Sequence, residues 1–519
     1  MYRMLVALHY SLLQKLFRVN FIPMNFKNKV NDLLDDLEVN IISTKSGRTS
    51  QGKFILRSLE LLKKSAIQQS ESVLDECSEP LISPVYLLKA LLAKKRGQDT
   101  LSLKFFEKAI NATGSTSDIL RINGDISHCY GFIETAIRSY DKAVELSPLN
   151  YQAFLGRGKT YSEMGKVTSA IDNLLQATLL NPESAKGYIA LGNEYRNSSM
   201  NDAAIKCYRT ALNREPENPI AQSALISILE LAIPHWHAAM LNDYERTEAF
   251  ETAINATVKP ETYVLDIGTG TGLLAMLASR AGARHVIACE AVEILAETAT
   301  KIIKDNGFDD KISIIHKHSE FLSIGVELEQ KADVLIAELV DASLLGENII
   351  PVINDAVKRL CKPGVVVIPC GATVFAAPFE SEKIYKESRV DKVAGFDIQL
   401  FNRINPRMRL QTDLSKFQWK ILSKPTEIFK FEFPSKKFVP KRHEVKLTPN
   451  TDGMAHGIAL WFDLQLNKDI FISTSPFSAP THWKQSVYPL SSPMMVRKNK
   501  PISLLASYTE NRINVELGG

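Results

Sequence analysis

Cysteine is scarce and widely spaced in this chain. Only six cysteines occur among 519 residues, and no two of them form a C-x-x-C pair. This spacing excludes the common zinc motifs and a dense disulfide framework, so we expect a reduced intracellular protein without a metal site. Long apolar runs are missing as well. No stretch reaches the roughly 20 apolar residues that cross a membrane, so we expect no membrane contact.

A strong charge of either sign is also missing. The 62 basic and 58 acidic residues leave a net charge of +4, which gives no electrostatic argument for direct nucleic-acid binding. The length predicts about two to four domains, and we expect the protein in the cytoplasm and also in the nucleus. Residues 1–24 contain His9 and Gln14 and no small-residue cleavage site, which favours an amphipathic helix over a signal peptide or presequence.

The first half of the chain does contain an internal repeat of 34 residues. One position of each unit holds a small residue: Ala90, Gly124, Gly158 and Gly192. Another position holds a large residue: Phe106, Tyr140, Leu174 and Tyr208. Three units close with a proline: Pro148, Pro182 and Pro216. Small residues let two helices approach, large residues fill the gap to the next unit, and proline ends the second helix. The pattern resembles the tetratricopeptide repeat over residues 84–218.

Such repeats predict an α-solenoid with a concave peptide-binding face. We therefore expect a peptide or protein partner on the array. The alternative is that the array only packs against the neighbouring domain. Residues 1–83 also have helical patterning and predict a helical N-terminal region.

An α/β pattern begins near Tyr263, after a linker and helices at residues 219–260. Strand V-L-D-I is followed by G-T-G-T-G and a helix, and further strands are expected at 285–290, 312–316 and 333–338. This order predicts a Rossmann-like parallel sheet over residues 261–370, with its ligand at the carboxyl ends of the strands.

The glycine loop predicts a nucleotide-like cofactor. Gly268 and Gly270 let the backbone approach a ligand closely, and Glu290 at the end of the second strand can accept hydrogen bonds from ribose hydroxyls. Asp266 precedes the first glycine in a D-x-G-x-G-x-G run, and no basic residue stands beside Glu290. These details favour S-adenosylmethionine over the alternative, NAD.

Glu338 and Glu347 stand nine residues apart in A-E-L-V-D-A-S-L-L-G-E-N. Two carboxylates that converge repel each other, so a fold keeps them mainly for a cation. A planar guanidinium with its fork of donors fits them best. Asp341 lies between the pair and is expected either to bind substrate or to cap the loop.

Three further motifs complete a resemblance to the protein arginine methyltransferases over roughly residues 233–495. They are H-W-H-A-A-M-L-N-D-Y-E-R-T from His235, H-S-E at 318–320 and T-H-W at 481–483. The repeats point to the branch of that family that carries such arrays. The resemblance implies an S-adenosylmethionine-dependent enzyme that methylates arginine in protein substrates. The absence of a tyrosine-rich segment before the M-L motif implies a monomethyl or symmetric dimethyl product.

The resemblance also implies a role for each matching residue. Seven residues are expected to bind the cofactor: Arg246, Asp266, Gly268, Gly270, Glu290, Ser319 and Glu320. Glu338, Glu347 and His482 are expected to be catalytic, although His482 could instead be a buried structural histidine. Met240 and Trp483 are expected to line the substrate pocket, with plain helix packing as the alternative for Met240.

From Gly371 onward, short strands alternate with prolines and glycines, which predicts a β-barrel over residues 371–519. The irregular segment Phe396–Arg409 is expected to be a dimerisation arm, so we expect a homodimer. The chain as a whole predicts a multidomain protein: an α-solenoid, a Rossmann-like methyltransferase domain and a C-terminal β-barrel. The alternative to an enzyme is a tetratricopeptide scaffold with an inactive methyltransferase-like domain, and a small-molecule methyltransferase is a third hypothesis.

Overall fold

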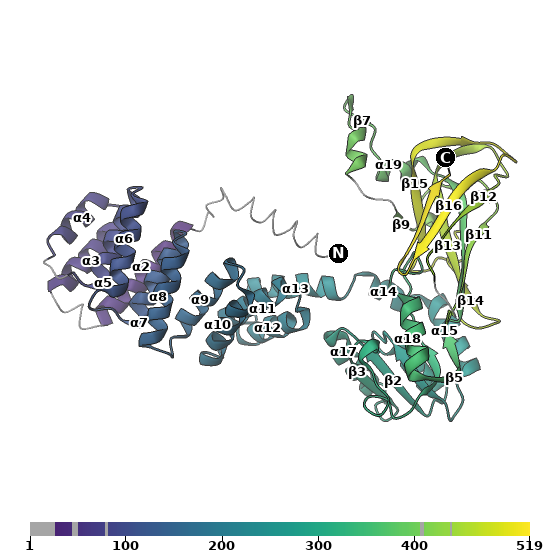
Figure 1. Ribbon diagram of the computed structural model, residues 1–519, viewed down its shortest axis with the longest axis horizontal. Helices are drawn as coiled ribbons and strands as arrows, with labels where there is room; N and C mark the ends of the chain where they lie inside the picture. Colours follow the sequence, from purple (N-terminus) through teal and green to yellow (C-terminus); the bar gives the residue numbers. More distant parts are fainter. Residues whose placement is uncertain (1–25, 44–49, 78–80, 405–408, 436–438, 519) are drawn as a thin grey trace. The chain divides into compact units, whose positions relative to one another are not determined.

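The computed structural model describes residues 26–43, 50–77, 81–404, 409–435 and 439–518. They fall into two compact units, Met1–Ala232 and Ile233–Gly519 (Figure 1). The helix expected within residues 1–24 lies outside the described residues. Among the helices that the structure describes, none is both long enough and apolar enough to cross a bilayer.

The described part of the first unit is helical. Its helices are α2 Phe26–Ser43, α3 Ser50–Lys63, α4 Ile67–Asp75, α5 Ser83–Lys95, α6 Asp99–Asn111, α7 Ser117–Cys129, α8 Ile133–Leu146, α9 Tyr151–Glu163, α10 Val167–Leu180, α11 Ala185–Asn197, α12 Asn201–Arg214 and α13 Pro219–Ala232. Sequential helices pack as pairs, from α5 with α6 to α11 with α12. The predicted array of helix–turn–helix units is confirmed.

Small and large residues meet within each pair, as the repeat predicts. A side-chain carbon added at Gly124 would lie 2.6 Å from the ring of Tyr140, so only glycine fits there. A further register was not expected from the sequence. Thr116, Asn150 and Ser184, again 34 residues apart, each cap the first helix of a unit by accepting a hydrogen bond from a backbone N–H.

The second unit begins with α14 (Trp236–Leu241) and α15 (Tyr244–Thr257), followed by a parallel sheet. The strands are β1 Tyr263–Ile267, β2 His285–Glu290, β3 Ile312–His316, β4 Ala332–Ile336 and β5 Cys361–Ile368. The connecting helices are α16 Leu273–Arg280, α17 Glu293–Asp305, η2 Ser319–Phe321 and α18 Ile349–Leu360. The strand order β3-β2-β1-β4-β5 reverses direction between β1 and β4, where such folds bind ligands. The Rossmann-like fold is confirmed, but β4 ends at Ile336, so Glu338 lies in the loop beyond it.

The C-terminal half of this unit is antiparallel. Its strands are β6 Gly371–Glu380, β7 Lys392–Val393, β8 Phe396–Asp397, β9 Leu410–Thr412, β10 Lys420–Ile421, β11 Thr426–Glu432, β12 Lys441–Leu447, β13 Gly453–Gln465, β14 Phe471–Ser473, β15 Gln485–Val496, β16 Ile502–Thr509 and β17 Arg512–Leu517. One sheet runs β10-β6-β13-β15-β9, with β11 on β6 and β14 on β13, and a second runs β12-β16-β17. The Tyr488 hydroxyl of β15 donates to the Ile513 carbonyl of β17 at 2.6 Å and joins the two sheets. The predicted C-terminal β domain is confirmed, and in the described residues its antiparallel strands form these two sheets, a half-barrel.

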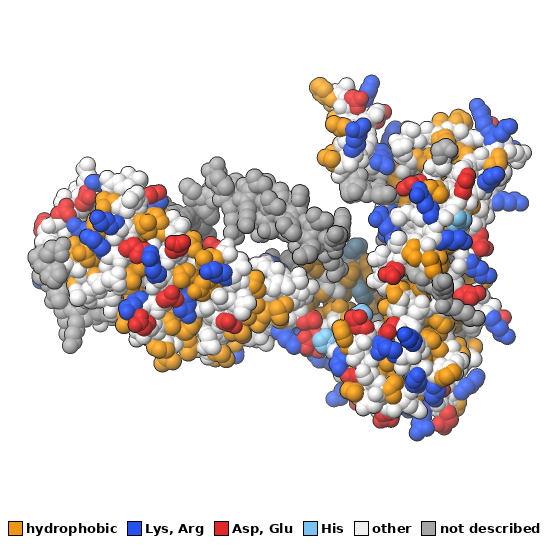
Figure 2. All heavy atoms as spheres, in the orientation of Figure 1, with side chains coloured by type: hydrophobic (Ala, Val, Ile, Leu, Met, Phe, Trp, Pro, Cys, Tyr) orange, Lys and Arg blue, Asp and Glu red, His pale blue; other side chains and the backbone are white. Residues whose placement is uncertain are grey.

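An arm leaves this domain between β6 and β9. It comprises α19 (Glu382–Ser388), the β7–β8 hairpin and η3 (Gln399–Arg403). Figure 1 shows the hairpin standing away from the two sheets, and Figure 2 shows hydrophobic side chains on it. The exposed large hydrophobic residues of the hairpin, of η3 and of the residues next to them are Val393, Phe396, Ile398, Leu400, Phe401 and Ile404. The predicted arm, Phe396–Arg409, overlaps this element, and its residues 405–408 lie outside the described ranges.

Candidate active site

The glycine loop lies between β1 and α16, at the carboxyl edge of the sheet. Gly268, Gly270 and Gly272 have φ values of 71°, 57° and 82°, a left-handed conformation that side chains rarely adopt. Asp266 is buried at the end of β1, where its Oδ2 accepts a hydrogen bond from the Thr269 hydroxyl at 2.6 Å. Burial raises the pKa of Asp266 to about 7. The loop thus presents backbone rather than side chains to the edge where a ligand would lie.

Glu290 holds this loop from the next strand. Its Oε2 accepts from the Gly270 N–H at 3.0 Å, and its Oε1 accepts from the Val292 N–H at 2.9 Å. A space next to Gly270 stays open, because a carbon added there would meet nothing within 4 Å. Each carboxylate oxygen of Glu290 keeps a second lone pair for a hydroxyl donor.

Arg246 stands in the first turn of α15 and is almost fully buried. Its Nη2 lies 2.7 Å from Glu338 Oε2, and the two side chains are only 3% and 8% exposed. The Nε and Nη1 atoms of Arg246 are buried, and neither has a hydrogen-bond partner among the described residues. Orphaned buried donors of this kind are rare and costly unless a ligand meets them. The arrangement fits a bound carboxylate.

Glu347 lies at the far end of the glutamate loop and interacts electrostatically with Glu338 and Asp341. Burial raises its pKa to about 7, and the negative charges of Glu338 and Asp341 push it in the same direction. The structure therefore brings the two predicted glutamates within electrostatic range of each other. A guanidinium between them would relieve the repulsion and favour the ionised form of Glu347.

Asp243 is the acidic partner of His482, and the sequence alone did not identify it. The Asp243 Oδ2 lies 2.9 Å from His482 Nδ1 and accepts from the His482 backbone N–H at 2.8 Å. Its Oδ1 caps α15 by accepting from the Arg246 N–H at 3.0 Å. Burial raises the pKa of Asp243, but the hydrogen bonds from His482 outweigh it and the net pKa is lowered. One carboxylate thus holds the T-H-W segment against the helix that carries Arg246.

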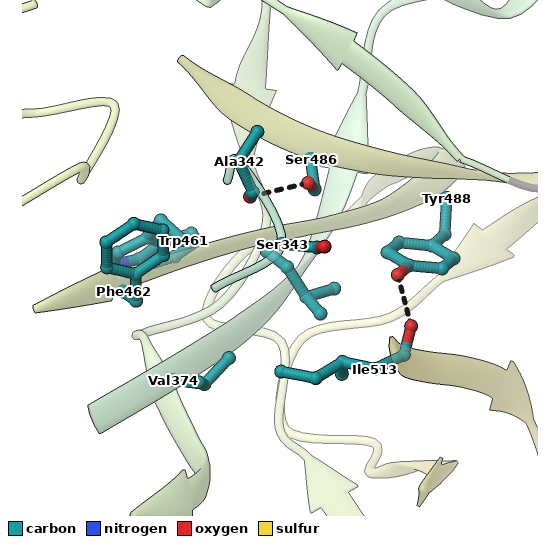
Figure 3. Close-up of a pocket in the computed structure, with 9 residues that line it drawn as sticks. Ala342, Ser343, Val374, Trp461, Phe462, Ser486, Tyr488 and Ile513 are labelled. Atoms are coloured by element: carbon teal, nitrogen blue, oxygen red, sulfur yellow. Dashed lines mark hydrogen bonds between the residues drawn. The ribbon is translucent and has the colours of Figure 1, made fainter. Parts of the chain in front are cut away.

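Trp483 is only 2% exposed, so in this structure it does not form an open channel wall. Its Nε1–H donates to the Val340 carbonyl of the glutamate loop at 2.7 Å. A cavity lined by Ser343, Phe462 and Ser486 among others has a volume of only about 10 Å³ (Figure 3). That is room for about one water molecule and excludes a ligand there. The contacts of Trp483 make it a support for the loop.

Ser319, Glu320 and Met240 are the remaining predicted site residues. Ser319 and Glu320 form η2 after β3, with Ser319 buried and Glu320 exposed. Met240 is half-buried in α14, and its carbonyl accepts from the Asp243 N–H at 3.2 Å. Their roles stay predictions, as does the whole assignment of site residues.

Parts of the chain match known protein families. Residues 371–517 match the arginine methyltransferase oligomerization subdomain, and residues 244–373 match ribosomal protein L11 methyltransferase. Residues 151–184 and 185–218 each match the tetratricopeptide repeat. The matched ranges fall on the last two repeat units of the array, on the parallel sheet and on the antiparallel domain.

Several curated relatives are similar to part of the chain. An arginine N(omega)-methyltransferase of Streptomyces achromogenes subsp. streptozoticus is 33% identical over 307 residues, which are 59% of this chain and 85% of that protein. Protein arginine N-methyltransferase 7 of Drosophila willistoni is 31% identical over 312 residues, 52% of this chain and 45% of that protein. The Oryza sativa subsp. indica protein of the same name is 29% identical over 316 residues and 44% of it is covered. The chain thus spans less than half the length of the latter two relatives.

Two solved structures are also similar. The Trypanosoma brucei PRMT1 enzyme-prozyme complex with AdoHcy has a TM-score of 0.49 and 27% identity, covering 56% of this chain and 95% of that one. Arabidopsis thaliana protein arginine methyltransferase 10 has a TM-score of 0.46 and 23% identity, covering 55% and 92%.

Proposed function

The chain belongs to the protein arginine methyltransferase family, and we propose that it transfers a methyl group from S-adenosylmethionine to a guanidinium nitrogen of arginine in protein substrates. One observation carries the proposal. Arg246, with two unpartnered donors, is paired to Glu338 at 2.7 Å, and Glu347 lies within electrostatic range of that pair. Glu338 therefore belongs to two proposed sites. It is paired with the arginine that would bind the carboxylate of the cofactor, and together with Glu347 it would bind the substrate guanidinium.

The residues present fit the cofactor. S-Adenosylmethionine, when bound, supplies a methyl group activated by its sulfonium. Arg246 would hold the carboxylate of its methionine part through Nε and Nη1, which have no hydrogen-bond partner in the described part of the chain. The positive-φ glycines let the backbone lie close to it, and Glu290 would accept from its ribose hydroxyls. Ser319 and Glu320 would contact its adenine.

The two glutamates would bind and polarise the substrate guanidinium. An arginine side chain is protonated and therefore a poor nucleophile. Carboxylates on one side draw the positive charge toward two of its nitrogens, so the third recovers lone-pair character. Fixed carboxylates in a buried site need no reorganisation during the transfer. Arg246 orients Glu338, because its Nη2 lies 2.7 Å from the Glu338 carboxylate and both side chains are almost fully buried.

The proton released by the methylated nitrogen needs an acceptor. Glu347, with a pKa raised to about 7, can take a proton near neutral pH. The His482–Asp243 pair is a second acceptor, at 2.9 Å between Nδ1 and Oδ2. We assign Glu347 the first role because it belongs to the pair that would hold the guanidinium.

The product and the assembly are also proposed. Met240, in the helix before Asp243, would limit the pocket to a monomethyl or symmetric dimethyl product. The exposed apolar residues of the arm would pack on a second copy and form a homodimer, which fits the oligomerization subdomain matched at residues 371–517. The tetratricopeptide array would bind a peptide or protein partner. Its place in the cytoplasm and nucleus stays a prediction.

A second candidate substrate is free arginine. It is favoured by one observation: the relative of which 85% is covered is named for arginine and not for protein arginine. The array favours proteins, because a free amino acid needs no peptide-binding solenoid.

One assay separates these substrates. Purified protein is incubated with methyl-labelled S-adenosylmethionine and, in parallel, with free arginine or an arginine-containing protein extract. We expect labelled methylarginine after hydrolysis of the protein fraction, and amino-acid analysis identifies the product. Label only in free methylarginine would move the substrate to the amino acid. A protein that binds S-adenosylhomocysteine yet labels neither would contradict the enzyme and support the scaffold hypothesis.

A further inference from the structure

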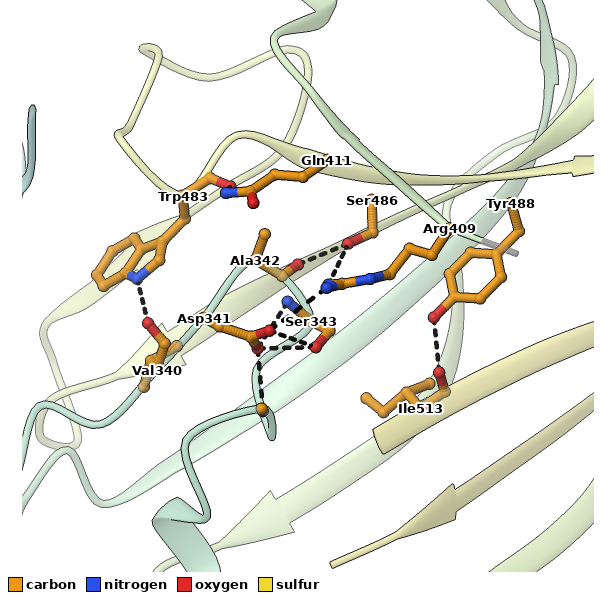
Figure 4. A network of polar contacts seen from close by, with 11 residues as sticks. Val340, Asp341, Ala342, Ser343, Arg409, Gln411, Trp483, Ser486, Tyr488 and Ile513 are labelled. Atoms are coloured by element: carbon orange, nitrogen blue, oxygen red, sulfur yellow. Dashed lines mark hydrogen bonds and ion pairs between the residues drawn. The ribbon is translucent and has the colours of Figure 1, made fainter. Parts of the chain in front are cut away.

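The loop between the two glutamates is attached to the antiparallel domain at three successive residues. The Trp483 Nε1–H donates to the Val340 carbonyl at 2.7 Å, and the Ser486 hydroxyl donates to the Ala342 carbonyl at 2.8 Å. Between them, Asp341 Oδ2 lies 3.6 Å from Arg409 Nη2 (Figure 4). The shape of the loop is therefore set from outside the parallel sheet.

Asp341 is used inside the loop. Its Oδ1 accepts from the Ser343 N–H at 2.9 Å, the Ser343 hydroxyl at 2.7 Å and the Gly346 N–H at 3.0 Å. A side-chain carbon at Gly346 would lie 2.3 Å from Asp341 Oδ2. The carboxylate thus fills the interior of the loop, which favours the capping role over substrate binding. The loop also holds buried Leu344 at φ 74°, a conformation that residues with side chains avoid.

Arg409 joins this loop to strand β15. It precedes β9, and its side chain is 30% exposed. Its Nη1 donates to the Ser486 hydroxyl at 3.3 Å while Nη2 faces Asp341, so one guanidinium bridges both elements. Figure 4 shows the side chain reaching across to the loop. A planar fork suits this double contact better than a lysine ammonium does.

We propose that Arg409 is a positioning residue for methyl transfer: through Asp341 and Ser486 it fixes the loop that carries Glu338 and Glu347. The inference rests on the proposed function. Arg409 touches neither glutamate and acts through the loop. It also balances the charge of Asp341, which otherwise adds to the negative charge around Glu347.

The charges around Glu347 give this role a distinctive signature. Glu338 and Asp341 of its own loop raise the pKa of Glu347. Arg246 of α15 is paired with Glu338, and Arg409 from the antiparallel domain is paired with Asp341. Removal of Arg409 would leave the Asp341 charge uncompensated and raise the pKa of Glu347 further. Removal of the Asp341 charge would lower it.

Hydrogen exchange tests the attachment without any activity. The Ser343 and Gly346 amides, which donate to Asp341, are followed by mass spectrometry in the full chain. We expect faster exchange in Arg409→Met and Asp341→Asn, and a smaller increase in Arg409→Lys, which keeps the charge. Arg497→Met is the matched control, because it removes an exposed Arg–Asp pair of the same domain, 3.1 Å from Asp452. Unchanged exchange in Arg409→Met would overturn the proposal.

The pH dependence of turnover tests the charge. We expect Arg409→Met to lower kcat about tenfold with unchanged binding of S-adenosylhomocysteine. The acid limb of kcat should move up by about half a pH unit in Arg409→Met and down in Asp341→Asn. Shifts of the same sign in both variants would overturn the proposal. A wild-type protein that transfers no methyl group would overturn the proposed function instead, while the exchange experiment still decides the role of Arg409.

Discussion

In the absence of cofactor and substrate, the ionised Glu347 side chain should destabilise the folded protein above neutral pH. Burial, followed by the charges of Glu338 and Asp341, raises its pKa from 4.5 to about 7. A carboxyl whose pKa is raised by folding binds its proton more tightly in the folded state. Its stabilising contribution is therefore complete below pH 4.5 and is lost as the pH rises through about 7. At about 1.4 kcal/mol per pH unit, the shift corresponds to about 3 kcal/mol.

Glu347→Gln puts a neutral side chain of similar shape in this position. We expect the variant to equal the wild type at pH 4 and to exceed it at pH 8 by up to about 3 kcal/mol in free energy of unfolding. Urea unfolding can be followed by tryptophan fluorescence. All four tryptophans, Trp236, Trp419, Trp461 and Trp483, lie in the second unit, so the signal reports that unit.

Glu427→Gln is the matched control, because Glu427 is exposed on β11 of the same unit. Its effect on the free energy of unfolding should be the same at pH 4 and at pH 8. A Glu347→Gln protein that is no more stable than wild type at pH 8 would refute the burial and repulsion assigned to Glu347. The same result would remove Glu347 as the group with an elevated pKa that accepts the proton.

Three further substitutions test other parts of the molecule. Glu338→Gln should keep S-adenosylhomocysteine binding but lower turnover about 10²–10³-fold, since a buried charge aimed at the reaction is lost; wild-type turnover would contradict the role of the pair. Phe396→Glu places a charge on the apolar arm, and light scattering should then show half the wild-type mass; an unchanged mass would exclude the arm as the dimer contact. Gly124→Ala forces a methyl group against Tyr140 and should lower the free energy of unfolding of the array by about 1–3 kcal/mol. The loss of helical circular dichroism in urea measures this change. An unchanged stability would mean that the Tyr140 ring moves aside.

The sequence predicted those features that depend on neighbours in the chain. The 34-residue registers, the glycine loop and the nine-residue spacing of the glutamates are visible because each repeats or clusters locally. Contacts between distant residues were not predictable in this way. His482 and Asp243 are 239 residues apart, and the sequence around either residue does not predict their contact. Even so, the D-x-x-R pattern before α15 is a recognisable N-cap, and it could have singled out Asp243.

The end of β4 shows why boundaries were less predictable than elements. Asp333–Glu338 reads as a strand because its residues are mostly apolar, yet pairing stops at Ile336. Beyond that point the chain enters the glutamate loop, whose path is set by contacts from β15 and the segment before it. The T-H-W motif likewise predicted a residue that lines the substrate pocket, whereas Trp483 is buried and supports Val340.

The glutamate loop departs furthest from what local sequence preferences would choose. It places two mutually repelling carboxylates in partly buried positions, turns a third inward and holds Leu344 in a left-handed conformation. Each departure costs stability, and such departures persist only where surrounding structure enforces them. The enforcing groups are Trp483 and Ser486, which lie 143 and 144 residues from the loop carbonyls that they hold. The loop therefore supplies the reactive carboxylates, whereas residues of the antiparallel domain fix the conformation of the loop. Substitutions at these contacts should change turnover even though the residues touch neither reactant.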